Sequence, residues 1–212
     1  NFLDDPAIEG IVINFRDVTD RVKAERKIIH LSTHDPLTGL PNKINFDNRI
    51  DMLLKSAKAN DTGFAILMLD IDSLMYIKNT LGYKLTEEYL AQIAIKLKLY
   101  CDSTKFICRY SANRFIIIFE GTHTIDEYET FIKGIYALFS TPLKVDKFEL
   151  YVDISIGISF FSKDDESREQ LIRNAEAAIY LAKNKGKNKY KYYSSDIDIQ
   201  SYKHFILVRI CE

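Results

Sequence analysis

The sequence feature that most constrains the fold is the run from Phe64 to Asp72, which reads FAILMLDID. The run has the length of a strand, and no polar residue interrupts it before Asp70. Strands with one solvent-exposed face typically alternate apolar and polar residues, and this run does not alternate. The strand is therefore expected to be buried on both faces. The run therefore predicts a core strand that presents two carboxylates, Asp70 and Asp72, at its end.

A second stretch, Phe106 to Phe119, predicts a β-hairpin. Two β-rich apolar runs, 106–108 and 115–119, flank a short polar tip at Ser111–Arg114. The tip is expected to face solvent or a ligand. Together with the strand that ends in two acids, the hairpin predicts a site formed by strand-end carboxylates and a hairpin tip.

Amphipathic helices are predicted between the strands, because apolar residues recur there at helical spacing. The predicted helices cover residues 21–31, 44–59, 74–81, 86–100, 124–139 and 167–185, and further strands are expected at 148–161 and 189–193. Gly186 is the expected C-cap of the last helix. Helices and strands that alternate around a hairpin predict an α/β (α+β) sandwich, with a mixed sheet and helices on its faces.

Bulk composition excludes several classes of protein. Apolar residues make up 47% and charged residues 28% of the 212, which is typical of a globular domain and not of a disordered chain. A net charge of −1 gives no electrostatic footprint for nucleic acid, and no apolar run approaches the ~20 residues of a membrane span. The three cysteines have no metal-like spacing and favour a reducing, cytoplasmic location.

Five motifs resemble, in order and in spacing, those of the GGDEF family of diguanylate cyclase domains. They extend from about residue 31 to residue 193, which is most of the chain. The motifs are Asp35-x-Leu37-Thr38-Gly39-Leu40-x-Asn42, Asp70-Ile71-Asp72, the hairpin from Arg109-Tyr110 to Phe115, Ser155-Ile156-Gly157-Ile158, and Ala178-x-Tyr180-x-Ala182-Lys183-x-x-Gly186-Lys187-Asn188. Each motif is weak by itself, and the five in register make a specific match.

The resemblance implies a ferredoxin-like fold of the nucleotide-cyclase or polymerase-palm type. Its central sheet is expected to be mixed and mostly antiparallel, with flanking helices and a hairpin that carries the signature motif. The resemblance also implies a parent protein in cyclic di-GMP signalling, GTP as a ligand, and a homodimer, because family cyclases work as pairs that each supply one GTP.

The expected domain organisation follows from the same resemblance. Residues 1–18 look like the last strand and exit of a PAS sensor domain, and residues 19–33 are a linker helix. A single heptad of apolar spacing in this helix leaves a coiled coil and a solvated connector both open. The GGDEF-like domain covers residues 34–194, and residues 195–212 look like a tail or linker toward a further domain, for which an EAL phosphodiesterase is the usual neighbour.

Joining two GTP molecules is phosphoryl-type transfer, which needs divalent metals and carboxylates to hold them. The resemblance assigns Mg²⁺ to Asp70 and the backbone carbonyl of Ile71, with Asp72 as a further candidate ligand. The second family acid is replaced by Asn113, and the next acid by Arg114. The latter is a change of about two charge units, and it opposes metal binding because Coulomb energies at a few Å reach several kcal/mol.

The nucleotide-binding positions are altered as well. Ser111 and Ala112 replace the two glycines that let GTP lie against the hairpin in the family, while Phe115 keeps the frame of the motif. Lys78 stands at the position of a guanine-reading asparagine, and Glu87 at that of an aspartate. Both changes alter the recognition of the base.

Some of the basic residues of the family are kept in this sequence and others are replaced. Lys183 and Lys187 match phosphate-contacting residues of the family, although they could equally be surface lysines that complement a helix dipole. Met75 replaces a family lysine. The inhibitory Arg-x-x-Asp motif would fall at Asp102 to Lys105, where the charges are inverted, so product inhibition at that place is expected to be absent.

These changes predict a degenerate GGDEF domain without cyclase activity that needs no cofactor. It would act as a regulatory or dimerisation module between a sensor and an output domain. Two alternatives stay open. In one, the domain binds GTP without turnover and controls an attached phosphodiesterase; in the other, it is a weakly active diguanylate cyclase in which Asp72 or Glu87 replaces the missing acid.

Overall fold

The structure is a computed structural model that describes residues 17–60, 62–101, 105–121, 123–161 and 167–194. The chain divides into two compact units, Asn1–Ser32 and Thr33–Glu212. In the first unit, helix α1 (Thr19–Thr33) confirms the helix predicted at 21–31 and begins two residues earlier. The strand expected at the start of the chain and the tail from residue 195 on lie outside the described residues.

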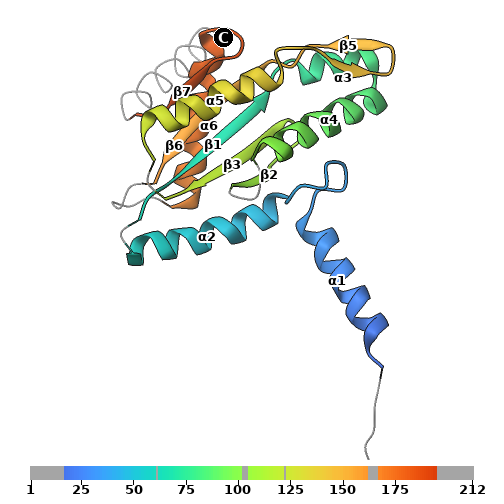
Figure 1. Ribbon diagram of the computed structural model, residues 1–212, viewed down its shortest axis with the longest axis vertical. Helices are drawn as coiled ribbons and strands as arrows, with labels where there is room; N and C mark the ends of the chain where they lie inside the picture. The colour runs from blue at the N-terminus through green and yellow to red at the C-terminus, as the bar shows by residue number, and fades with distance from the viewer. Residues whose placement is uncertain (1–16, 61, 102–104, 122, 162–166, 195–212) are drawn as a thin grey trace, which may run out of the picture. The chain divides into compact units, whose positions relative to one another are not determined.

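The second unit is built on a five-stranded sheet (Figure 1). Its strands are β1 (Phe64–Ile71), β2 (Phe106–Arg109), β3 (Arg114–Glu120), β6 (Ile154–Phe160) and β7 (Tyr190–Tyr192). Their order is β2-β3-β1-β6-β7. All neighbouring strands are antiparallel except β6 and β7, which are parallel. This arrangement confirms the mixed, mostly antiparallel sheet that the sequence predicts.

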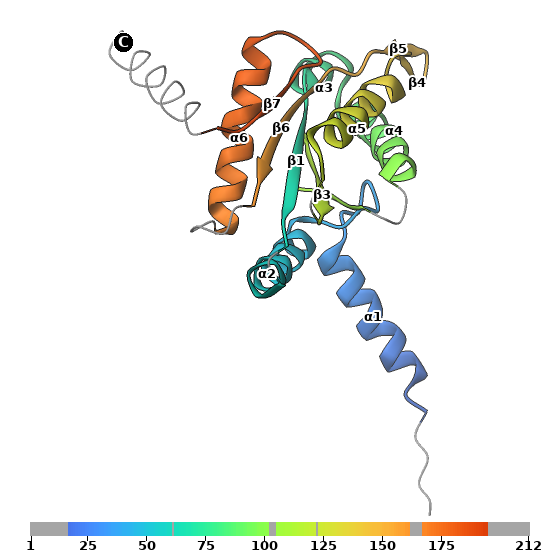
Figure 2. The ribbon, with the colours of Figure 1, turned by 60° about the vertical axis from the view of Figure 1, so that its left-hand side comes forward.

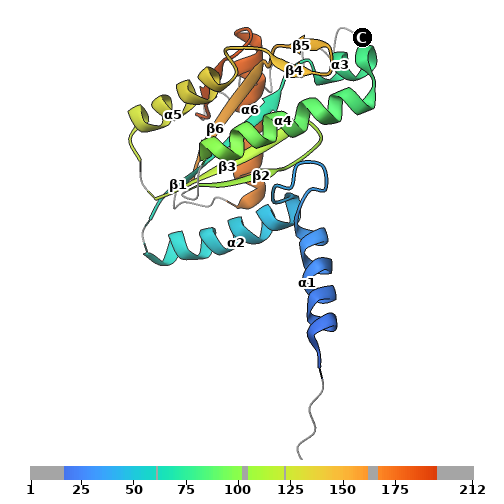
Figure 3. The ribbon, with the colours of Figure 1, turned by 45° about the vertical axis from the view of Figure 1, so that its right-hand side comes forward.

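Helices cover both faces of this sheet, as the predicted sandwich requires. They are α2 (Lys43–Asn60), α3 (Leu74–Leu81), α4 (Tyr83–Cys101), α5 (Ile125–Leu138) and α6 (Arg168–Asn184). Figure 2 shows α6 on one side of β1 and β6 with α4 and α5 on the other, and Figure 3 shows α4 in front of the strands. In the described part of the chain, no helix combines the length and apolar character that a membrane span needs.

The central strand β1 is buried along its whole length, as its apolar run predicts. Its side chains alternate between two cores. Leu67 and Leu69 pack in the core that α4 and α5 cover, whereas Ile66 and Met68 pack in the core that α2 and α6 cover. Burial contributes about 1.5–3 kcal/mol for each such side chain, so packing on both faces fixes the strand that carries Asp70 near its end.

The prediction of one strand over residues 148–161 is wrong. The structure has two strands there, β5 (Phe148–Leu150) and β6, and β5 pairs with β4 (Leu143–Val145) in a separate two-stranded sheet. The turn between β4 and β5 contains Asp146 at a φ of 53°, a left-handed conformation that aspartate tolerates better than most residues. Strands of three residues are too short to give a periodic sequence signal.

The last helix also ends slightly earlier than predicted. α6 stops at Asn184, and its C-cap is Lys185, whose backbone N–H donates to the carbonyls of Ala182 and Lys183. Gly186 follows at a φ of 108°. Gly186 therefore provides the positive φ of the turn after the helix, and Lys185 is the C-cap.

The close packing of α6 on the sheet depends on Gly157 in β6. A Cβ atom at this position would lie 2.1 Å from the carbonyl oxygen of Ala175 and 2.8 Å from the amide nitrogen of Ile179, both on α6. These are backbone atoms, which cannot move aside as a flexible side chain can. Only glycine lets the helix come this close to the strand.

We predict that Gly157→Ala destabilises the protein by about 1–3 kcal/mol, because the added methyl group displaces α6. The thermal unfolding midpoint should fall by several degrees. Ser159→Ala is the matched control: Ser159 lies on the same strand, is fully buried, and has no partner for its hydroxyl among the described contacts. A Gly157→Ala midpoint equal to that of Ser159→Ala would contradict the prediction.

Candidate functional site

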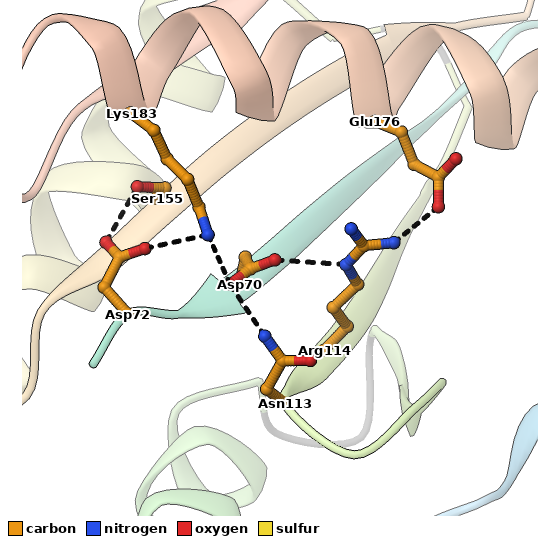
Figure 4. Close-up of polar contacts among 7 residues, drawn as sticks. All are labelled: Asp70, Asp72, Asn113, Arg114, Ser155, Glu176 and Lys183. Carbon is orange, nitrogen blue, oxygen red and sulfur yellow. Dashed lines mark hydrogen bonds and ion pairs between the residues drawn. The ribbon is translucent and has the colours of Figure 1, made fainter. Parts of the chain in front are cut away.

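The sheet register places Asp70 of β1 between residues of the two neighbouring strands. Asp70, the last residue but one of β1, lies opposite Arg114 of β3 on one side and opposite Ser155 of β6 on the other. Directly opposed residues of antiparallel strands point to the same face of the sheet. We call the group of seven side chains that meets there the strand-end site; its members are Asp70, Asp72, Asn113, Arg114, Ser155, Glu176 and Lys183 (Figure 4).

Asp70 is the centre of the strand-end site. Its side chain is only 3% exposed, and both carboxylate oxygens accept hydrogen bonds. Oδ1 accepts from Nζ of Lys183 at 2.8 Å and from Nδ2 of Asn113 at 2.9 Å. Oδ2 accepts from Nε of Arg114 at 3.1 Å. Two cations and one amide thus surround a buried carboxylate (Figure 4).

Arg114 joins the end of β1 to helix α6. Its Nε donates to Asp70, and its Nη1 donates to Oε1 of Glu176. Partial burial opposes the charged form, but the hydrogen bond that Arg114 donates to Asp70 and the negative charge of Glu176 outweigh this effect, so the pKa of Arg114 is raised. The sequence pattern predicts Arg114 in the hairpin tip, whereas in the structure Arg114 is the first residue of β3.

Lys183 reaches the strand-end site from the last turn of α6. Its Nζ lies 2.8 Å from Asp70 and 3.1 Å from Oδ1 of Asp72. The other oxygen of Asp72 accepts a hydrogen bond from Oγ of Ser155 at 2.8 Å. Partial burial lowers the pKa of Lys183, but the hydrogen bonds and charges of the two aspartates outweigh this and raise it above its usual value.

A pocket of about 320 Å³ opens beside these charges. Many of the candidate site residues predicted from the sequence line this pocket. They are Asp70, Ile71, Asp72, Met75, Lys78, Ala112, Asn113 and Lys183, together with Ser73 and Leu74. The tertiary structure therefore brings together the strand end, the hairpin tip and the two lysines, Lys78 and Lys183.

Other predicted residues do not line this pocket. Glu87 is an exposed residue of α4. Nζ of Lys187 lies 2.7 Å from Oδ2 of Asp153, outside the strand-end site. Ser111 lines a separate pocket on the other side of the tip, and Phe115 is fully buried in the core. Its burial supports its predicted part in the frame of the hairpin.

Of two further family positions, one makes a local contact and the other is exposed. Nζ of Lys78 lies 4.4 Å from the centre of the Tyr83 ring, a cation–π distance. Met75 is 67% exposed. At the place of the inhibitory motif, Lys105 lies 5.0 Å above the ring of Phe119, and Asp102 is outside the described residues.

The motifs do not predict two contacts of the strand-end site. Ser155 belongs to a recognised motif, but its hydrogen bond to Asp72 was not expected. Glu176 is not selected at all, although it lies seven residues before Lys183 on the same helix, so both residues share one helix face. That spacing is the signal that could have identified Glu176.

The hairpin frame is fixed by an ion pair outside the strand-end site. Nη1 of Arg109, at the end of β2, donates to Oδ1 and Oδ2 of Asp35 at 2.9 and 3.0 Å. Oδ1 of Asp35 also accepts from the backbone N–H and the hydroxyl of Thr38. The backbone N–H of Arg109 donates to the carbonyl of Pro41 at 2.9 Å. The 35–42 loop is thus anchored to the base of the hairpin.

The family profile described as "Diguanylate cyclase, GGDEF domain" matches residues 32–189. The chain belongs to the GGDEF family. The match covers four of the five strands of the sheet (all but β7), the helices that pack on it and the strand-end site, so the resemblance given by the five motifs is confirmed.

Similar proteins contain further segments. The GGDEF domain is 29% identical over 180 residues to the bifunctional diguanylate cyclase/cyclic di-GMP phosphodiesterase MucR of Pseudomonas aeruginosa, over 85% of this chain and 26% of MucR. It is 20% identical over 197 residues to the cyclic di-GMP phosphodiesterase PdeR of Escherichia coli, over 93% of this chain and 29% of PdeR. The chain thus spans less than a third of the length of either relative.

A solved structure shares the fold. It contains the coiled coil and GGDEF domain of DgcB from Caulobacter crescentus in complex with c-di-GMP. It has a TM-score of 0.75 and 23% identity to this GGDEF domain, over 82% of this chain and 92% of that one. The nucleotide-cyclase fold predicted from the motifs is therefore confirmed.

We predict that Asp35→Asn lowers stability by roughly 1–2 kcal/mol near neutral pH, because hydrogen bonds to a charged group are lost. Burial tends to raise the pKa of Asp35, but the hydrogen bonds from Thr38 and Arg109 outweigh it, so this pKa is lowered. The ionised carboxylate therefore stabilises the fold above the usual aspartate pKa of about 3.9, and this contribution is lost as the pH falls through the lowered value.

The measurement is thermal unfolding of both proteins from neutral to acid pH. The difference between Asp35→Asn and the unsubstituted protein should shrink below about pH 4. Asp146→Asn, at an exposed turn residue, is the control and should change the midpoint little at any pH. A difference in unfolding midpoint between Asp35→Asn and the unsubstituted protein that stays constant down to strongly acid pH would contradict the lowered pKa of Asp35.

Proposed function

We propose that this GGDEF domain makes no cyclic di-GMP and acts as a regulatory or dimerisation module of a cyclic di-GMP signalling protein. The main observation in support of the proposal is the hydrogen bonding of the Asp70 carboxylate. The acid at which the family binds its metal has both oxygens engaged by Lys183, Asn113 and Arg114. Phosphoryl transfer depends on metal-bound oxygens at such a position.

The hairpin tip supports the same proposal. Ser111 and Ala112 are exposed at the positions of two glycines, and each adds a side chain where a nucleotide would approach the backbone. Lys78 packs on Tyr83 in place of an asparagine that reads guanine. Changes at the metal, phosphate and base positions together argue against turnover more strongly than any single change.

The expected partners are other parts of the same protein. MucR and PdeR are named as a bifunctional cyclase/phosphodiesterase and as a phosphodiesterase, and each is more than three times as long as the aligned region. We propose that the parent protein likewise joins this domain to a PAS-like sensor on its N-terminal side and an EAL-like phosphodiesterase on its C-terminal side. We place it in the cytoplasm, where cyclic di-GMP signalling operates, with a second copy of the domain as a further partner.

The first test is incubation of the purified chain with GTP and Mg²⁺ or Mn²⁺, followed by chromatography of the nucleotides. We expect no cyclic di-GMP above the background without enzyme, because Asp70 is paired with cations of its own chain. A GGDEF protein of established cyclase activity is the positive control. Robust production of cyclic di-GMP by this chain would sink the proposal.

A second candidate function is allosteric binding of GTP without turnover. The pocket of about 320 Å³ and the two lysines that line it, Lys78 and Lys183, favour this candidate. A weakly active cyclase is less well supported. It would need a substitute acid, but Asp72 is bonded to Ser155 and Lys183, and Glu87 is not in the lining of the pocket.

Calorimetric titration with GTP tests the second candidate. If GTP binds in this pocket, Lys183→Gln should weaken binding about tenfold, equivalent to roughly 1.4 kcal/mol, because a phosphate contact is lost. Lys144→Gln is the matched control, since Lys144 is exposed on β4 and does not line the pocket. The absence of binding at millimolar GTP would exclude the candidate.

A further inference from the structure

We propose that Arg114 and Lys183 take the place of a divalent cation at the end of β1. In this interpretation the chain itself supplies the positive charge that the buried carboxylate needs, and the site takes up no metal ion. We call the group formed by Asp70, Arg114 and Lys183 the cation clamp. The inference deepens the proposed function and rests on it, because a working cyclase would need the metal.

The hydrogen-bond geometry at Asp70 is the first argument. Mg²⁺ and Mn²⁺ bind carboxylates through the oxygen lone pairs. One oxygen of Asp70 already accepts from Lys183 and Asn113, and the other accepts from Arg114. The side chain is 3% exposed, so a metal ion that approached these oxygens would meet Lys183 and Arg114 at hydrogen-bond distance from them.

The balance of charges is the second argument. Three carboxylates, Asp70, Asp72 and Glu176, meet two cations, Arg114 and Lys183, so the group carries one net negative charge. A divalent ion would add two positive charges next to two existing ones. The residues present do not fit the family's metal.

The cation clamp also joins parts of the chain that are far apart in sequence. Arg114 lies 44 residues from Asp70, and Lys183 lies 113 residues from it. Glu176 extends the connection, because it holds the other side of the Arg114 guanidinium from α6. Figure 4 shows Arg114 between the strand end and the helix. Arg114 is therefore a positioning residue that fixes the start of β3 against β1 and α6 without a bound ligand.

The experiment measures Mn²⁺ binding without nucleotide, by loss of the free Mn²⁺ signal in electron paramagnetic resonance and by the thermal unfolding midpoint. The unsubstituted protein should not reduce the free Mn²⁺ signal, and Mn²⁺ should not change its unfolding midpoint. The double variant Asn113→Asp, Arg114→Glu removes one cation and adds two acids beside Asp70. It should bind Mn²⁺, and Mn²⁺ should raise its midpoint by several degrees. Lys58→Glu, an exposed charge reversal on α2, is the control and should gain no response.

A second variant keeps the test decisive if the double variant does not fold. Arg114→Gln removes the charge and the guanidinium donors without adding an acid. Its midpoint should fall by several degrees, and amide hydrogen exchange should rise at both the start of β3 and α6. A midpoint equal to that of Lys58→Gln would overturn the clamp. Binding of Mn²⁺ by the unsubstituted protein would also overturn it. If the unsubstituted protein binds Mn²⁺ but makes no cyclic di-GMP from GTP, only the cation clamp is overturned and the proposed function remains. If it makes cyclic di-GMP, the cation clamp and the proposed function are both overturned.

Discussion

The carboxylate of Asp70 lies at the end of a strand that has a neighbour on each edge and a core on each face. Burial of an unpaired charge costs several kcal/mol, so partners must be placed close by. Arg114 and Lys183 are those partners, and they come from β3 and α6. The start of β3 and the last turn of α6 are therefore positioned by one buried charge.

The frame of the domain does not depend on the side chains of Ser111 and Ala112 in the hairpin tip. The ion pair between Asp35 and Arg109 anchors the base of the hairpin, Phe115 fills the core, and Gly157 lets α6 lie against β6. None of these contacts involves Ser111 or Ala112. A chain can therefore keep the GGDEF fold while the residues that the fold presents to a nucleotide change.

Much of the fold was readable from periodicity. β1, the hairpin and the amphipathic helices give strong local patterns, because their burial is set by residues close in sequence. The β4–β5 hairpin was not readable, because strands of three residues carry no periodic signal and their pairing is decided by the turn at Asp146. The exact start of β3 at Arg114 depends on pairing with Asp70, which is a long-range contact.

The sequence by itself determined the family, the central strand and which residue types stand at the signature positions. It identified Asp70, Arg114 and Lys183 separately, and it indicated that Arg114 adds positive charge near the strand end. Only the tertiary structure decided that Arg114 and Lys183 bond to the same carboxylate, and that Glu176 holds Arg114 from the opposite side. The physical reason is that ion pairing depends on distances of a few Å between residues far apart in the chain, which no local pattern encodes.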